Sequence, residues 1–273
     1  ALVGAKVGFL IFSAGVEGQP GALARFQAIF ASPEIRFATK LSLISCSATA
    51  VLSLITAVPI GYLMARFRFR GKAFVDGMLD VPIVLPPLVL GLGLLILFQT
   101  RIWGGRTVED WIEAAGKALL PIRLFGHEFL DIRLGVTYRV PAVILAQYMV
   151  SCAFAVRTMR STFEQISPRQ EEVAMTLGGS RRQAFFGVTL PRARTGLLAA
   201  FTLAWARALG EFGPILIFAG ATRRKTEVLS TTVFLEMSAG NVENAVAVSL
   251  LMVAAAALAL TVIRVFGHRS ALE

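Results

Sequence analysis

Two ionisable side chains, Arg207 and Glu211, interrupt a long apolar stretch between residues 194 and 220. Residues four positions apart lie on one face of a helix, so these two charges can form an ion pair. A lone charge at the centre of a bilayer costs roughly 2.5–3.5 kcal/mol, so such residues are rare and mark functional positions. The pair is either a structural ion pair between helices or part of a path for an anion, which Glu211 alone would repel.

Other groups with potential chemistry do not form a recognisable site. Cys46 and Cys152 lie inside apolar runs, without metal-ligand spacing. The two histidines, His127 and His268, fall on opposite sides of the predicted membrane topology. We therefore expect no catalytic residue, no metal site and no cofactor bound by this chain, which is not predicted to be an enzyme.

Nucleotide and nucleic-acid binding are also excluded by the sequence. A phosphate-binding loop needs Gly-Lys followed by Ser or Thr, and neither Gly71-Lys72 nor Gly116-Lys117 has that residue. The formal net charge is +10, but no basic patch alternates with aromatic residues as base stacking requires. Any ATP that drives this protein must therefore bind to another subunit, and nucleic acid is not a predicted partner.

Long uncharged apolar runs predict an all-α bundle embedded in a lipid bilayer. Hydrophobic residues make up 56% of the chain and charged residues 16%, against about 25% charged in soluble domains. Residues 41–65 form a run of 25 residues without a charge, and a bilayer core needs roughly 20. We predict one transmembrane domain over 1–273 with about six spans, the first of them partial: 1–16, 38–65, 74–99, 136–157, 194–220 and 244–265.

The short loops set the orientation of these spans. Residues 66–72 hold three arginines and one lysine, which predicts that this loop is cytoplasmic. The loop 158–193 and the C-terminus then also lie inside, and the segment 100–135 lies outside, where residues 108–120 have the spacing of a surface helix. A basic triplet falls outside against the usual bias, either as a solvated loop or as a site for an anion or an acidic partner. It consists of Arg223, Arg224 and Lys225.

The predicted span 74–99 contains three prolines, Pro82, Pro86 and Pro87. Each removes a backbone donor, so the span should be kinked, with freed carbonyls that need partners. The kink serves either packing or a passage whose lining bends between states. An ion-coupled secondary transporter or channel is the alternative from another class, but it needs titratable relays inside the membrane, and only Arg207 and Glu211 qualify.

The cytoplasmic loop 158–193 holds two predicted short helices. The first begins in a capping box at Ser167 and runs to about Leu177, where a pair of glycines ends it. The second begins in another capping box at Ser180 and is ended by Pro191.

The first of these helices has an apolar stripe with a charged rim. The stripe consists of Val173, Ala174 and Leu177. The rim consists of Arg169, Glu171 and Glu172. Such a helix projecting from the bilayer is either a docking element for a soluble partner or an ordinary interfacial helix.

The run from residue 172 to residue 191 resembles the EAA-type signature of ABC importer permeases. The matching residues are Glu172, Ala174, Gly178, Val188, Leu190 and Pro191, with Val173 where the family usually has Ala. The resemblance implies that the loop contains the coupling helix, which docks into a separate ATPase subunit. Glu171 and Leu177 are counted with the coupling residues.

Further stretches are similar to permeases of the molybdate type: residues 81–95, 156–180 and 206–220, the last followed by Lys-Thr at 225–226. This resemblance implies an ABC permease fold that carries an oxyanion, molybdate or tungstate by preference, across the cytoplasmic (inner) membrane. Sulfate or thiosulfate permeases share much of the pattern and are the alternative. The resemblance also implies a second copy of this chain, two ATPase subunits that bind ATP and Mg, and an extracytoplasmic binding protein.

Overall fold

The computed structural model describes residues 30–103, 105–119 and 135–269, and the regular structure of these residues is almost entirely helical. The exception is a ribbon of two short strands, β1 (Arg101–Trp103) and β2 (Arg106–Thr107). The predicted all-α fold class is therefore confirmed. The predicted partial span 1–16 lies outside the described residues.

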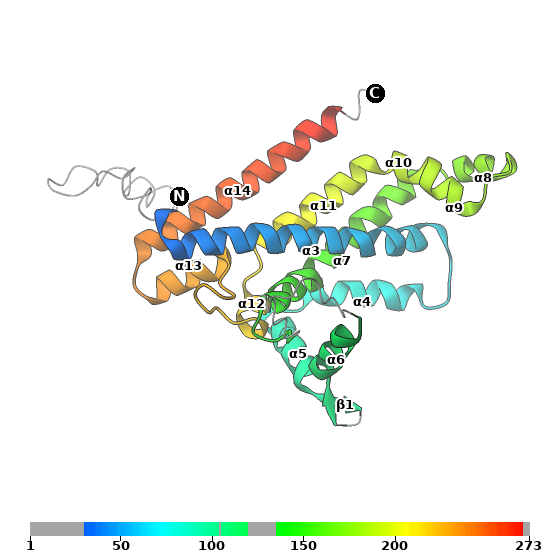
Figure 1. Cartoon of the computed structure of the whole chain (residues 1–273). Coiled ribbons are helices and arrows are strands. Elements are labelled where there is room, and N and C mark those ends of the chain that lie inside the picture. The colour runs from blue at the N-terminus through cyan, green and yellow to red at the C-terminus, as the bar shows by residue number, and fades with distance from the viewer. Residues whose placement is uncertain (1–29, 104, 120–134, 270–273) are drawn as a thin grey trace, which may run out of the picture.

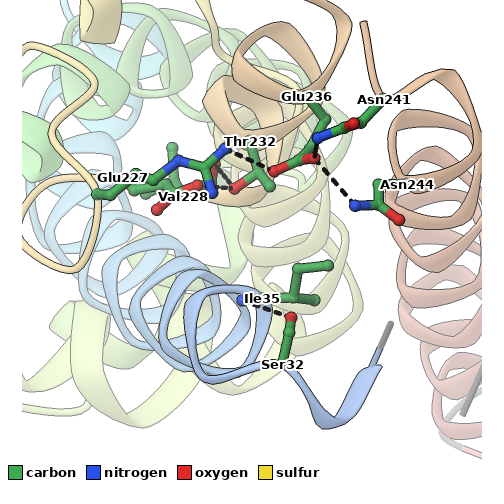
Figure 2. Close-up of polar contacts among 9 residues, drawn as sticks. Ser32, Ile35, Glu227, Val228, Thr232, Glu236, Asn241 and Asn244 are labelled. Carbon is green, nitrogen blue, oxygen red and sulfur yellow. Dashed lines mark hydrogen bonds and ion pairs between the residues drawn. The ribbon is translucent and has the colours of Figure 1, made fainter. Parts of the chain in front are cut away.

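The longest described helix is α3 (Pro33–Arg66), which extends across the molecule (Figure 1). It begins after Ser32, whose hydroxyl oxygen accepts a hydrogen bond from the Ile35 amide, as Figure 2 shows. The helices α7 (Val140–Gln165) and α11 (Arg194–Leu209) pack against it. The shared contact is rich in small residues, which let helices in a membrane approach closely. They include Ala50, Ala57, Ala155, Ala200 and Ala204.

The predicted span 74–99 is two helices, α4 (Lys72–Val84) and α5 (Pro87–Gln99), bent by 114°. Two consecutive prolines explain why the bend is far sharper than the predicted kink. A proline forces the residue before it into an extended conformation, and both Leu85 and Pro86 have ψ near +140°. Pro82 is accommodated inside α4. Two ion pairs hold α4 against α7, Arg157 with Asp80 and Arg160 with Asp76.

The predicted span 194–220 is also interrupted, so the prediction of one continuous helix is wrong. The helix α11 ends at Leu209, and α12 (Gly213–Phe218) begins after a break at residues 210–212. Pro214 lacks the amide that would donate to the carbonyl of Gly210, and glycine itself is a weak helix former. One helical hydrogen bond is therefore missing at residues 210–212, where the chain turns.

The two interrupted segments cross each other closely. A Cβ added to Gly91 of α5 would lie 2.8 Å from the Pro214 Cα, and one added to Gly213 would lie 2.9 Å from the Pro87 Cβ. Real side chains do not approach so closely, so glycine is required at both positions. Leu94, Phe98, Ile215 and Phe218 continue the contact in a buried cluster.

Three further helices are α6 (Val108–Leu119), α13 (Leu229–Ser238) and α14 (Val242–Arg269). The bounds of α6 agree within one residue with the helix predicted from the spacing of apolar residues at 108–120. Three described helices are long and apolar enough to cross a membrane: α3, α7 and residues 242–259 of α14. The bent pair α4–α5 makes a fourth if it is one span.

We predict that Gly91→Val lowers the melting temperature of the protein in detergent. The added side chain meets the backbone of Pro214, and overpacking of this kind costs about 1–3 kcal/mol, or several degrees. The control is Gly93→Val on the same helix, where an added Cβ meets nothing within 4 Å. Equal melting temperatures for the two variants, measured by fluorescence-detected thermal unfolding, would contradict the close crossing.

Candidate functional site

The end of the molecule at which α3 terminates carries a cluster of short helices (Figure 1). The helix α8 (Arg169–Thr176) is followed by α9 (Arg181–Ala184), a π-helix η2 (Phe185–Thr189) and α10 (Leu190–Arg192). These elements occupy the predicted coupling loop. We call them the tip.

The predicted boundaries of the tip helices are partly right. The helix α8 ends at Thr176, and Gly178 follows with a φ of +93°, a conformation that favours glycine. The capping box at Ser180 is present, with Gln183 as its partner. The capping box at Ser167 is wrong: the residue before α8 is Pro168, and no side chain caps the helix.

Pro191 does not end the second helix, contrary to the prediction. Instead the chain continues through η2 and α10 towards α11, with the Leu190 amide donating to the carbonyl of Phe185, five residues back. A π-turn is wider than an α-turn and occurs as a local bulge within helices. The missing amide of Pro191 is thus accommodated in a widened segment.

Apolar side chains of the tip face solvent in this chain. Leu177 is 84% exposed and Val173 is 58% exposed, while Ala174 is half-buried. Glu172 is exposed beside them. Of the signature residues further along, Pro191 is exposed, whereas Val188 and Leu190 are half-buried. The predicted stripe therefore exists as an exposed surface at α8 and its C-cap that has no partner among the described residues, and Val188 and Leu190 are less exposed.

Glu171 lies on the opposite side of α8 and is buried, so its prediction as part of an exposed rim is wrong. Its carboxylate accepts hydrogen bonds from the hydroxyls of Tyr62 and Thr189, each at 2.6 Å. It also accepts one from Nε of Arg66 at 3.2 Å and forms an ion pair with that guanidinium. We call these four residues the Glu171 cluster.

The charge of Glu171 follows from its partners. Burial alone would raise the pKa of this carboxyl group, but hydrogen bonds from Thr189 and Tyr62 and the charge of Arg66 hold it below its usual range. Glu171 is therefore an ionised carboxylate at neutral pH. Sequence reasoning missed Tyr62 and Thr189, which lie 109 and 18 positions from Glu171 in the sequence, and assigned Arg66 only a topological role.

The predicted ion pair of Arg207 and Glu211 is present, with a separation of 2.7 Å between Nη2 and Oε1. Glu211 is buried in the break between α11 and α12, and its carbonyl accepts a hydrogen bond from Ser230 at 2.6 Å. The guanidinium carbon of Arg207 lies 5.8 Å from the centre of the Phe154 ring. Pro87 reaches the same region through its contact with Gly213, whereas Pro82 lies inside α4.

The basic triplet lies at the other end of α3, beside a buried polar cluster. Arg223 pairs with Glu236 at 2.7 Å, so it is not a free cation. Figure 2 shows Glu236 also facing Asn241 and Asn244, which each donate to it at 3.0 Å. The neighbouring Arg224 and Lys225 are exposed. Sequence reasoning missed Glu236, whose partners lie in the loop before α13 and at the start of α14, 5 to 13 positions away.

Among the described residues, no group of three or more His, Cys, Asp or Glu side chains is placed to hold a metal ion. At the tip, the carboxylate of Glu171 bonds to its neighbours in the Glu171 cluster. At the break between α11 and α12, Glu211 bonds to Arg207 and Ser230. The arrangement is suited to holding helices in position and to binding a partner at the tip.

Comparison with known sequences identifies the family of this chain. The family described as "Binding-protein-dependent transport system inner membrane component" matches residues 57–270. The sulfate transport system permease protein CysT of Escherichia coli is 30% identical over 87% of this chain and 78% of its own. The molybdenum transport system permease protein ModB of Mycobacterium bovis is 33% identical over 86% of this chain and 80% of its own.

A third relative is the molybdate/tungstate transport system permease protein WtpB of Pyrococcus abyssi, which is 35% identical over 68% of this chain and 62% of its own. Among solved structures, a bacterial ABC transporter involved in the import of alginate superposes with a TM-score of 0.70, covering 98% of this chain and 90% of that one at 17% identity. That likeness is one of fold. The chain therefore belongs to the binding-protein-dependent inner membrane components, the non-catalytic permease subunits of ABC importers.

Proposed function

We propose that this permease carries an oxyanion, and that the oxyanion is molybdate or tungstate. The observation that carries the proposal is the run Leu-Gly-Glu-Phe-Gly at residues 209–213, which resembles the molybdate type. In this chain the run forms the break between α11 and α12 and contains the partner of Arg207. The relatives named for molybdate or tungstate, at 33% and 35% identity, support the same substrate.

Sulfate or thiosulfate is the second candidate. It is supported by the match to CysT, which extends over 237 residues at 30% identity. Molybdate, tungstate and sulfate are all tetrahedral divalent anions, so a passage built for one has the charge and shape to admit another. Discrimination between them therefore has to be measured.

The proposed assembly contains two copies of this chain, two ATPase subunits and an extracytoplasmic binding protein. The chain lacks a phosphate-binding loop, so ATP and Mg have to be bound by the ATPase subunits. The tip supplies the docking surface, since Leu177 and Val173 expose apolar area that no other described residue covers. In this arrangement the tip and the C-terminus are cytoplasmic, and the basic triplet lies on the outer side.

Metal uptake tests the substrate. Cells expressing this chain with its ATPase and binding protein should accumulate molybdenum or tungsten in the presence of a large excess of sulfate. The readout is the metal content of washed cells, with cells lacking the permease as the control. Accumulation that sulfate abolishes would contradict the molybdate proposal and favour a sulfate importer.

Docking is tested by a charge placed on the exposed surface of α8. Val173→Asp should abolish co-purification of the ATPase subunit and oxyanion uptake, because an aspartate would be buried in the docked interface without a partner. The matched control is Val242→Asp at the start of α14, since Val242 is 55% exposed, close to the 58% of Val173. Co-purification that survives in Val173→Asp, or is lost equally in Val242→Asp, would contradict docking at the tip.

A further inference from the structure

We propose that Glu171 is a positioning residue that ties the docking helix α8 to the membrane helix α3, so that movement of α8 is carried into the bundle. This inference rests on the proposed docking of an ATPase subunit at the tip. It assigns a role to the buried side of α8, whereas docking concerns the exposed side. The Glu171 cluster is the observation that carries it.

Both ends of α8 adjoin points at which the backbone turns. The extended residue Ile166 lies three positions before α8, and Gly178 with its positive φ follows it, so both ends can act as hinges. Glu171 is the one buried residue among the eight of α8. If a partner pushed on Val173 and Leu177, α8 would rotate about its ends unless its inner side were anchored.

Glu171 provides that anchor by contacting two other elements. Tyr62 and Arg66 lie four residues apart at the end of α3 and reach the carboxylate from one helix face. Thr189, the last residue of η2, donates from the segment that leads towards α11. The side chains of Glu171 and Arg66 are both nearly excluded from solvent, so these charge-assisted bonds compete little with water.

The aromatic surroundings of Tyr62 make the anchor stiff. Its ring packs edge-on against Phe163 of α7 at 5.6 Å and against Phe185 of η2 at 4.7 Å between ring centroids. A displacement of Glu171 is therefore transmitted to α3, α7 and η2 together. Packed side chains and rigid helices are the kind of connection through which two sites can be coupled.

At its other end, α3 contacts α13, so a displacement of α3 would reach that helix. The hydroxyl of Ser42 accepts a hydrogen bond from the amide of Leu229 at 2.8 Å, at the start of α13. The same helix contains Glu236, which belongs to the polar cluster of Figure 2. A single helix, α3, thus links the tip to the opposite end of the molecule.

The test compares uptake with ATP hydrolysis in vesicles that contain the complete complex and the binding protein. In Glu171→Gln the ATPase subunit should still co-purify and hydrolyse ATP within about twofold of wild type, because the exposed face of α8 is unchanged. Molybdate taken up per ATP should fall roughly tenfold, within the range of coupling seen between linked sites. The control is Glu164→Gln, which removes an exposed Glu–Arg pair at the end of α7 and should leave the ratio unchanged.

Thr189→Val and Tyr62→Phe each remove one hydroxyl of the cluster and serve as second variants if Glu171→Gln is not inserted into the membrane. Each should lower uptake per ATP with hydrolysis retained. An unchanged ratio in the cluster variants, or parallel loss of hydrolysis and uptake, would overturn the tie. Failure of the proposed function would show differently, as a wild-type complex that binds no ATPase subunit or takes up neither molybdate nor sulfate.

Discussion

The carboxylate of Glu171 sets the geometry of the tip, because a buried charge is tolerated only when its partners are in place. Its three donors come from α3 and η2, and they fix which side of α8 faces the protein. Residues two and six positions further along a helix point away from that side, which is where Val173 and Leu177 are exposed. The buried Glu171 carboxylate and the exposed apolar surface proposed for docking are thus two consequences of one helix orientation.

A second constraint acts within the bundle, where backbone groups freed from helices need protein partners. The prolines that separate α4 from α5 and the Gly-Pro pair that separates α11 from α12 lie near each other, because Gly91 and Gly213 allow α5 and α12 to cross closely. The carbonyl of Glu211, freed at the break, accepts a bond from Ser230. Both interruptions therefore belong to one region of the bundle.

Local signals in the sequence predicted the features that depend on local chemistry. The Ser180–Gln183 capping box, the stop at Gly178 and the ion pair of Arg207 with Glu211 involve residues at most four positions apart. The Glu171 cluster was missed because Tyr62 and Arg66 are more than 100 residues away in sequence. The bend of 114° was underestimated, because the two consecutive prolines hold both Leu85 and Pro86 extended, which turns the chain more sharply than a single proline kink. Pro191 was misread because a π-turn has no simple sequence signature.

The central claim is that α8 and the end of α3 move together when the ATPase subunits bind ATP. Spin labels can be placed at Thr176 on α8 and at Leu63 on α3, which are both exposed. Pulsed electron resonance would then report the distance between the two labels. Only one permease copy in the complex carries the labels, and its two native cysteines are replaced. The account predicts one narrow distance distribution that is the same with and without ATP in wild type, and a broad or shifted one in Glu171→Gln. A wild-type separation that changes on ATP binding would contradict it.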